Sequence, residues 1–468
     1  MTELHDLTAL EQGRAVRARE VSPVELVDHY LERIDRLSDS VGAFVTVTGD
    51  LARKRARLAE ASVGDTTSPL YGVPTAVKDL NLTAGVVTEM GSATMKGYVP
   101  DVSDEVVLRL EAAGTISLGK TTTPEFGSPC YTEPDNAPPA RTPWDLERMA
   151  GGSSGGAAAA LAGGLVAVAQ GSDGGGSIRI PASCCGLFGI KPSRGRISGA
   201  PMYGDPVGLS TSGPLARTVR DAAAMLDVLA GPAVGDPFWA PPPATSFLDA
   251  CEVEPGRLRI ARFLAPVIAD APVHPEVVEA YESASRLLAA LGHDVEEIDV
   301  PLPPEAVPTF ETCWAVLTAL STPPPGTEHL LRPLTAWLSE RGRAVSGPAF
   351  GLAVGEARRV AARAVHALAP YDAVLTPTLA QPPLPVGALR DDADPARDFE
   401  NQKAFTPWTS AWNLTGMPAV SLPLHMTRGG LPVGVMLAGR PAEEHLLLSL
   451  SAQVEAAAPW LDRHPPCW

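Results

Sequence analysis

The sequence predicts an α/β protein, because segments typical of buried strands alternate with segments typical of helices along most of the chain. The chain has 468 residues, of which 45% are hydrophobic and 19% are charged, as in globular proteins with a large core. No internal repeat stands out. A chain of this length could hold about two or three average domains, although large α/β enzymes of similar length form one.

The composition argues against several classes of protein. A formal net charge of −17 disfavours nucleic acid and anionic membrane surfaces as partners. The first ten residues, MTELHDLTAL, contain acidic residues and no apolar segment, so we expect no secretory signal there, and no apolar run is long enough to predict a membrane span. The six cysteines include no C-x-x-C pair, which favours free thiols in a reducing cytoplasm.

The first part of the chain predicts outer helices followed by buried strands. Ser22-Pro23-Val24-Glu25 is a capping box with proline at the first helical position, and apolar residues recur at helical spacing after it. An apolar run over residues 73–77 predicts a buried strand that ends at Lys78. The remaining predicted elements are strands at 41–47, 116–119, 165–169, 257–263, 293–300, 371–376, 418–424 and 431–437, and helices at 51–61, 103–113, 215–229, 276–291, 310–320, 350–368 and 443–457.

The most unusual stretch covers residues 151–191 and reads GGSSGGAAAALAGGLVAVAQGSDGGGSIRIPASCCGLFGIK. Two glycine-rich runs flank serines at 153–154 and 177 and are joined by an Ala-rich helix candidate. Glycine runs cost backbone entropy, so two of them in an apolar segment indicate backbone that approaches a ligand or adopts unusual dihedral angles. Three other interpretations of the glycine-rich runs fit less well. A flexible linker would not be followed by such an apolar segment. A phosphate-binding loop would end in G-K-[ST] and a dinucleotide-binding loop would need a further glycine, and the stretch has neither feature.

A serine nucleophile in this stretch would need a base other than histidine. No histidine lies between His29 and His274. A lysine can act as the base if burial lowers its pKa, and Lys78 follows an apolar strand candidate.

The motifs together resemble the amidase signature family. They are VKD at 77–79, GGSSGG at 151–156, GSDGGGSIRIPAS at 171–183, GIKP at 189–192 and NLTGMPAVSLP at 413–423. The resemblance implies an α/β/α sandwich, with a central mixed sheet flanked by helices on both faces. It also implies amide hydrolysis through a Ser–cis-Ser–Lys triad, in which Ser177 is the nucleophile, Ser153 the cis-serine and Lys78 the base. The 24 residues from Ser153 to Ser177 match the family pattern.

The same resemblance assigns roles to neighbouring residues. Backbone N–H groups of Gly174, Gly175, Gly176 and Ser177 are expected to form the oxyanion hole. Three further residues, Ser154, Asp173 and Arg179, are expected to support the site rather than react.

Among the branches of the family, the chain is most similar to the 6-aminohexanoate cyclic-dimer hydrolases. The similarity rests on RGRIS at 194–198, GDPFWAPPP at 235–243 and a cysteine-bearing helix at 310–320. In that branch a cysteine on the matching helix lines the pocket, so Cys313 is a candidate pocket residue, with a buried core cysteine as the alternative. Phe405, Trp408 and Trp412 are candidates for an apolar wall.

We therefore expect one amidase domain over residues 1–468. Its parts are an N-terminal helical segment (1–65), a signature core (66–240), a variable substrate-side helical insert (300–370) and C-terminal strands and a helix (371–468). The expected substrate is a small, largely apolar amide. We expect the reaction to need no cofactor or metal, and the expected location is the cytoplasm. A homodimer is an open alternative to a monomer. Two other functions stay open, namely the amidase subunit of a tRNA-dependent amidotransferase and a non-catalytic binding scaffold.

Overall fold

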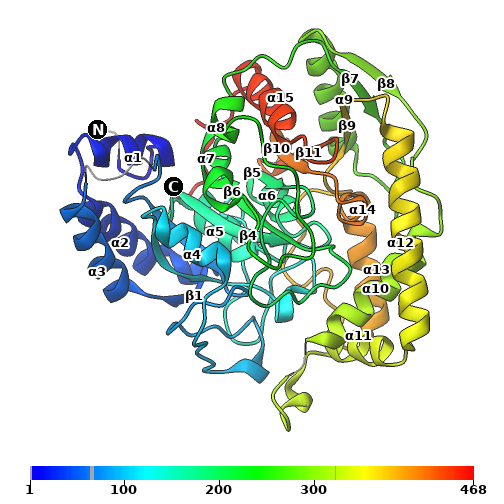
Figure 1. The fold of residues 1–468 in the computed structure, drawn as a ribbon, viewed down its shortest axis with the longest axis horizontal. Helices are drawn as coiled ribbons and strands as arrows, with labels where there is room; N and C mark the ends of the chain where they lie inside the picture. The colour runs from blue at the N-terminus through cyan, green and yellow to red at the C-terminus, as the bar shows by residue number, and fades with distance from the viewer. Residues whose placement is uncertain (1–2, 64–67, 322) are drawn as a thin grey trace.

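The structure is a computed structural model, and it describes residues 3–63, 68–321 and 323–468. The predicted boundary between the N-terminal segment and the signature core, at residues 65 and 66, lies outside the described residues. Figure 1 shows helices α1 (Ala9–Arg17) and α2 (Pro23–Val41) at one side of the molecule, the sheet in the middle, and the long helix α12 (Gly347–Leu368) at the other side.

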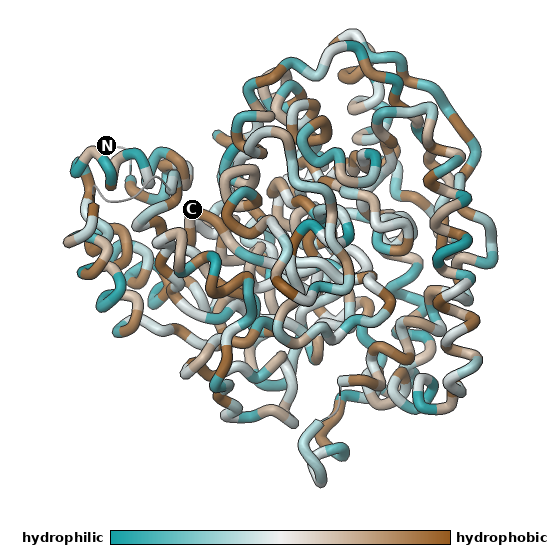
Figure 2. The backbone as a smooth tube through the Cα atoms, viewed as in Figure 1, coloured by the Kyte–Doolittle hydropathy of each residue, from teal (hydrophilic) through white to brown (hydrophobic). Residues whose placement is uncertain are grey.

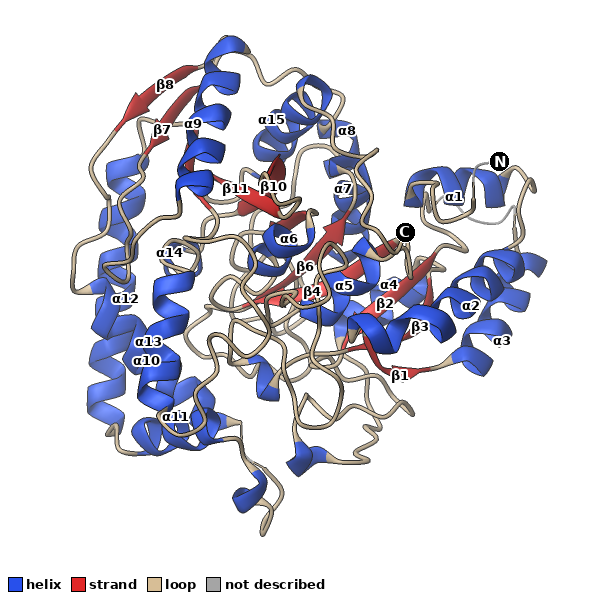
Figure 3. Cartoon of the chain, turned by 180° about the vertical axis from the view of Figure 1, so that it is seen from behind, coloured by secondary structure: helices blue, strands red, loops and turns tan. Residues whose placement is uncertain are grey.

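Within the described residues, eleven strands form one sheet in the order β1-β3-β2-β4-β6-β5-β10-β11-β9-β7-β8. The strands are β1 (Phe44–Val47), β2 (Pro74–Lys78), β3 (Ile116–Thr121), β4 (Val168–Asp173), β5 (Phe188–Lys191), β6 (Thr211–Ala216), β7 (Arg259–Arg262), β8 (Asp294–Glu297), β9 (Ala373–Pro377), β10 (Ala419–Met426) and β11 (Pro432–Gly439). Figure 3 shows β3, β2, β4 and β6 as neighbours, and loops that lie between this part of the sheet and helix α11 (Pro333–Arg343).

The sheet is mixed, which confirms the prediction. β2 pairs in parallel with both β3 and β4, and β7 pairs in parallel with both β8 and β9. Between these two parts, β6, β5, β10 and β11 pair antiparallel with their neighbours. The carboxyl ends of β2 and β4 therefore lie at the same edge of the sheet, where ligands bind in α/β folds.

Helices cover both faces of the sheet, as predicted. α5 and α6 contact each other and pack on β4 and β5, respectively, while α7 packs on β5 and β6 and contacts α15, which packs on β10 and β11. In addition to α1, α2, α11 and α12, the α-helices are α3 (Gly49–Ala61), α4 (Glu105–Ala112), α5 (Gly155–Ala162), α6 (Arg179–Cys185), α7 (Val219–Leu229), α8 (Phe247–Ala250), α9 (Pro275–Ala290), α10 (Ala306–Leu320), α13 (Pro395–Phe405), α14 (Ala411–Thr415) and α15 (Glu444–Ala457).

The predicted N-terminus of α2 is confirmed in detail. The Ser22 hydroxyl accepts a hydrogen bond from the Glu25 N–H, and the Glu25 carboxylate accepts one from the Ser22 N–H, so two backbone donors that the helix cannot pair are satisfied. Figure 2 shows hydrophobic and hydrophilic residues in turn along α2 and α12, as expected of helices with one buried face.

Several predicted elements differ from the structure. The predicted helix at 215–229 begins only at Val219, because β6 continues to Ala216 and the Thr218 hydroxyl caps the helix by accepting from the Asp221 N–H. The strand predicted at 165–169 begins at Val168 and extends to Asp173, so polar residues form its second half. The central stretch also contains α6 and β5, which the sequence reasoning did not predict because both are short.

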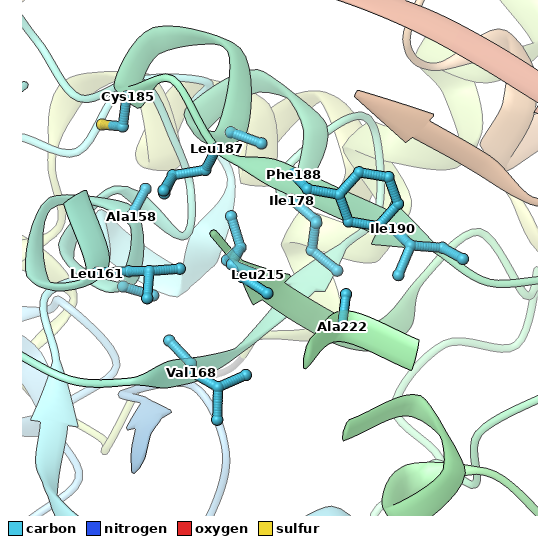
Figure 4. Close-up of a cluster of buried hydrophobic side chains, with 14 of the residues drawn as sticks. Ala158, Leu161, Val168, Ile178, Cys185, Leu187, Phe188, Ile190, Leu215 and Ala222 are labelled. Carbon is cyan, nitrogen blue, oxygen red and sulfur yellow. The ribbon is translucent and has the colours of Figure 1, made fainter. Parts of the chain in front are cut away.

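Helix α5 lies in the middle of the core, and all its residues are buried. Figure 4 shows Leu161 of this helix close to Val168 of β4 and Leu215 of β6. A Cβ atom at Gly156 would lie 2.4 Å from the Thr122 nitrogen, so only glycine lets the helix approach the backbone of its neighbour so closely. No helix in the described part of the chain combines the length and the apolar character needed to cross a bilayer.

Candidate active site

Lys78 is the last residue of β2 and lies at the edge of the sheet where β4 also ends. Its side chain is fully buried, and its Nζ donates hydrogen bonds to Ser153 Oγ at 2.8 Å and to Ser172 Oγ at 3.0 Å. Its backbone N–H donates to the Gln170 side chain at 3.0 Å. The sequence reasoning did not single out Ser172, which the parallel pairing of β2 and β4 brings to Lys78.

The surroundings of Lys78 favour a neutral amine. Burial lowers the pKa of Lys78 from 10.5 to about 7, and the negative charge of Asp173 only partly opposes this effect. Among the described residues, no carboxylate forms an ion pair with Lys78. A lysine with these properties can accept a proton at neutral pH.

Ser153 lies on the loop that leads into α5, and the Gly152–Ser153 peptide bond is cis, as the family resemblance implied. The Thr123 hydroxyl donates to the Ser153 carbonyl at 3.1 Å. Gly152 lies close to another segment, since a Cβ at this position would lie 2.8 Å from the Tyr131 nitrogen. These contacts fix the loop and direct the Ser153 hydroxyl to Lys78.

Ser154 connects the two halves of the site. Its N–H donates to the Ser177 carbonyl at 3.2 Å, and its hydroxyl donates to the Ser172 carbonyl at 3.2 Å. The structure thus places Ser154 in the hydrogen-bond network around the site rather than opposite a substrate.

Ser177 follows β4 after a loop of three glycines, and an ion pair holds this loop. Asp173 and Arg179, both fully buried, form two hydrogen bonds of 2.9 Å. Burial alone would raise the pKa of Asp173, but the Arg179 guanidinium overcomes it and lowers the pKa to about 2. Asp173 therefore stays ionised, and its charge holds the backbone on either side of Ser177.

One of the expected oxyanion donors is already occupied. The Gly176 N–H donates to Asp173 Oδ1 at 2.8 Å, so the expectation that it faces the substrate is wrong. In the part of the chain that the structure describes, the N–H groups of Gly174, Gly175 and Ser177 have no protein acceptor and stay available. Gly176 has a φ of +135°, and a Cβ there would lie 2.5 Å from Thr409 Oγ1, so this position requires glycine for geometry rather than for oxyanion binding.

Two cavities meet at Ser177. The larger has a volume of about 410 Å³ and is lined by Ser153, Ser172 and Gly174 among others. The smaller has a volume of about 70 Å³ and is lined by Gly175 and a largely apolar wall. Both cavities include Ser128, Ser177 and Trp314 in their lining.

The aromatic wall of the site comes from α10 and not from the predicted residues. Phe310 and Trp314 stack with ring centroids 5.6 Å apart and line the smaller cavity. The helix was predicted from the sequence. The i, i+4 spacing of Phe310 and Trp314, which places both rings on one face of the helix, was the signal that could have identified this wall.

The four candidate substrate-binding residues lie in the core instead. Cys313, Phe405, Trp408 and Trp412 are at most 1% exposed, and none of them lines either cavity at Ser177. Neighbouring residues of an α-helix point about 100° apart, so Cys313 faces the core while Trp314 faces the cavities. The alternative of a buried core cysteine therefore fits Cys313.

Another buried lysine lies close to the site but lacks a serine partner. Burial, followed by the positive charge of Arg179, lowers the pKa of Lys191 to about 7, and its Nζ donates to the Pro192 carbonyl at 2.8 Å. Lys191 does not line either cavity at Ser177. Its contacts indicate a structural role.

Among the described residues, one group of side chains could supply three metal ligands, namely Glu3, His5 and His29. The two imidazoles already share a hydrogen bond of 3.0 Å, and none of the three residues lines a cavity at Ser177. Burial, and then the charge of Arg33, lowers the pKa of His5 to about 4 and lowers the pKa of His29 below its usual value, so both imidazoles are mostly neutral at pH 7. This cluster ties the N-terminal segment to α2 and is no part of the site at Ser177.

Known proteins share the sequence pattern and the fold of this chain. The model of the Amidase family matches residues 25–448. The 6-aminohexanoate-cyclic-dimer hydrolase of Paenarthrobacter ureafaciens is 36% identical over 481 residues, covering 98% of this chain and 96% of the relative. A solved structure of 6-aminohexanoate cyclic dimer hydrolase complexed with substrate has a TM-score of 0.91 and 32% identity, covering 99% of this chain and 100% of that chain.

A more distant solved structure is that of a glutamyl-tRNA(Gln) amidotransferase subunit from Thermotoga maritima. It has a TM-score of 0.78 and 29% identity, covering 98% of this chain and 97% of that chain. The match over most of the chain, together with the fold and the arrangement around Lys78, shows that the chain belongs to the amidase family and is an amide-bond hydrolase.

Proposed function

We propose that the chain hydrolyses a small, largely apolar amide through an acyl-enzyme on Ser177, with Ser153 and Lys78 transferring the proton. The observation that carries the proposal is the contact of 2.8 Å between Ser153 Oγ and Nζ of a fully buried lysine whose pKa is about 7. An amine in this state is a base only for a group that it touches, and Ser153 is such a group.

In the first step, Ser177 Oγ attacks the carbonyl carbon of the amide. The proton of Ser177 passes to Ser153 Oγ while the proton of Ser153 passes to the neutral Lys78 Nζ. The carbonyl oxygen becomes negatively charged and accepts hydrogen bonds from the free N–H groups of Gly174, Gly175 and Ser177. Each such donor contributes about 3–4 kcal/mol to lowering the barrier.

In the second step, the carbon–nitrogen bond breaks and the amine leaves. The Lys78 ammonium returns its proton through Ser153 to the leaving nitrogen, which regenerates the neutral base. Water then attacks the acyl-enzyme, and its proton passes through Ser153 to Lys78. The same proton returns through Ser153 to Ser177 Oγ as the bond between Ser177 and the acyl group breaks and the carboxylic acid is released. Protonation of the leaving nitrogen is essential because an amide anion is a very poor leaving group.

The apolar character of the substrate is supported by the walls of the smaller cavity and by the relatives. The Paenarthrobacter ureafaciens relative is named for a cyclic dimer of 6-aminohexanoate, whose amide groups are separated by methylene chains. We expect the present chain to act on small amides of similar polarity, and to cleave the corresponding esters as a side activity.

An activity screen tests the proposal. It compares primary amides, anilides, linear and cyclic ω-amino-acid amides and esters, with glutamine and asparagine as references. We expect kcat/KM for the best apolar amide to exceed that for glutamine by at least about tenfold, or about 1.4 kcal/mol. Loss of this activity in Ser177→Ala, and labelling of the wild-type serine by a fluorophosphonate, would distinguish an enzyme from a non-catalytic scaffold.

The amidotransferase function is the second candidate, and the similarity to the Thermotoga maritima protein motivates it. That function would require partner subunits. If glutamine proves the better substrate, or if glutaminase activity depends on added partner subunits, this function replaces the proposed one.

A further inference from the structure

The two cavities at Ser177 differ in their access to the proton-transfer residues. Ser153 and Ser172, the two hydroxyls that contact Lys78 Nζ, both line the larger cavity. Neither Ser153 nor Ser172 is among the described residues that line the smaller cavity. Lys78 itself is fully buried, so a ligand reaches its proton only through Ser153 or Ser172 and only from the larger cavity.

This asymmetry orients the substrate. When the carbon–nitrogen bond breaks, the leaving nitrogen has to receive a proton from Ser153, and it must therefore face the larger cavity. The carbonyl carbon is bonded to Ser177 at that point, and Ser177 borders both cavities. The acyl substituent, on the other side of the carbonyl carbon, then has the smaller cavity available.

From this geometry we infer that the smaller cavity is the acyl subsite and the larger cavity the amine subsite, so that the enzyme is selective for the acyl group and permissive for the amine. The inference rests on the proposed function. It assigns the two volumes, about 70 Å³ for the acyl group and about 410 Å³ for the amine, to the two halves of the substrate.

The lining of the smaller cavity specifies the chemistry of the acyl group. The surface that faces this cavity is mostly apolar, and the apolar side chains in its wall are Ile180, Ile268, Val307, Phe310, Trp314 and Phe399. Apolar walls favour methylene and methyl groups and disfavour polar substituents. The acyl group is therefore a short apolar chain.

Charged residues in the wall of this cavity exclude an anionic acyl group. Lys403 and Glu311 both line the cavity and form an ion pair of 2.7 Å, and Glu400 contacts Lys403 at the same distance. Two carboxylates thus surround one ammonium, which leaves a net charge of −1 at this place. A carboxylate at the end of the acyl chain would meet a lysine that is already paired and a surplus negative charge.

One face of α10 borders both subsites, and its residues follow helical spacing. Val307, Phe310 and Glu311 line the smaller cavity, whereas Leu317 and Thr318 line the larger one. Trp314 lies between the two groups in sequence and lines both cavities. The same helix therefore offers matched variants for the two subsites.

Two substrate series test the inference. In the first, the acyl chain is lengthened from acetyl to octanoyl with methylamine as the constant leaving group. In the second, the acyl group is fixed and the amine is lengthened from methylamine to octylamine, which keeps the basicity of the leaving amine nearly constant. Released amine is measured with an amine-reactive fluorophore. We expect kcat/KM to fall at least tenfold beyond a short optimal acyl length and to change less than threefold along the amine series.

Matched variants of α10 test which cavity determines the dependence of kcat/KM on acyl length and which determines its dependence on amine length. Phe310→Ala is expected to shift the optimal acyl chain to longer lengths without altering the amine profile, and Leu317→Ala to alter only the amine profile. Val307→Ala serves in place of Phe310→Ala if the latter does not fold. Glu311→Gln is expected to raise kcat/KM for an adipoyl amide relative to a hexanoyl amide by about tenfold, because it removes the surplus negative charge while Lys403 stays paired with Glu400.

The outcomes separate the inference from the proposed function. Absence of Ser177-dependent hydrolysis for every member of both series would refute the proposed function. Hydrolysis that depends on Ser177 but is selective for the amine and permissive for the acyl chain would refute only the assignment of the subsites. An effect of Phe310→Ala on the amine series, or of Leu317→Ala on the acyl series, would also refute it.

Discussion

The pH dependence of acylation should follow the protonation of Lys78. With a pKa of about 7, half of the Lys78 side chains are neutral at pH 7, about one in ten at pH 6 and about nine in ten at pH 8. A lysine with the ordinary pKa would be neutral at pH 7 in only about one molecule in three thousand. We therefore expect kcat/KM to rise about tenfold per pH unit below pH 7 and to level off above about pH 8.

The measurement is a kcat/KM profile between pH 5 and 10 on a neutral amide, so that the substrate does not titrate. Lys78→Ala should lose most of the activity, and any remaining rate should lack this acid limb. A wild-type profile that keeps rising to pH 10, or a Lys78→Ala enzyme with the wild-type rate at pH 7, would refute the assignment of Lys78 as the base.

The same pKa has a consequence for stability that can be measured without substrate. The folded-state pKa lies below the unfolded value, so the unfolded chain binds more protons between about pH 7 and 10.5, and the contribution of Lys78 to stability increases with pH across this window. Relative to Lys78→Met, the wild-type free energy of unfolding should rise by up to about 1.4 kcal/mol per pH unit there. Urea unfolding of both proteins at pH 7, 8.5 and 10 measures this difference, and a difference independent of pH would contradict the buried, neutral state.

Three further predictions concern other parts of the site. Ser177→Ala should show no covalent labelling by a fluorophosphonate and no acyl-enzyme by mass spectrometry, whereas labelling of this variant would place the nucleophile elsewhere. Asp173→Asn should lower the free energy of unfolding by about 3–5 kcal/mol, because it leaves the Arg179 charge buried without its partner. The matched change in an exposed ion pair, Asp294→Asn, should cost less than about 1 kcal/mol. Equal costs of the two substitutions in urea unfolding would contradict a stabilising role of the buried ion pair between Asp173 and Arg179. Cys313→Ala should change kcat/KM less than about twofold while lowering stability by about 1 kcal/mol, as expected for a core position; a tenfold loss of kcat/KM at unchanged stability would show instead that the side chain acts on the substrate.

The candidate site was largely predictable from the sequence because its key residues lie in local motifs. Lys78 was identified from the apolar run before it and the VKD motif, and Ser153 and Ser177 from the glycine runs. The mixed sheet and its helical layers also followed from the resemblance to the family, although the chain shows only the alternation of strand and helix signals directly.

The remaining features depend on tertiary contacts that a linear pattern does not contain. Which face of α10 borders the cavities is decided by how the helix docks, so the choice between Cys313 and Trp314 was not available from spacing. Likewise, the Gly176 N–H is occupied because Asp173 turns back towards it, which depends on the ion pair of Asp173 with Arg179. The start of α7 was misplaced because the apolar residues at the end of β6 also fit a helical pattern.

The parallel pairing of β2 with β4 makes strand alignment a condition for catalysis. A shift by one residue would move Lys78 by about 3.3 Å relative to Ser172 and the loop that leads to Ser177, which is further than a hydrogen bond can stretch. The alignment is held by side chains as well as by the backbone, since Thr75 Oγ1 donates to the Val168 carbonyl at 2.9 Å and the Gln170 side chain accepts from the Lys78 N–H. Substitutions at Thr75 and Gln170 should therefore reduce turnover while the protein stays folded, although neither side chain lines a cavity at Ser177.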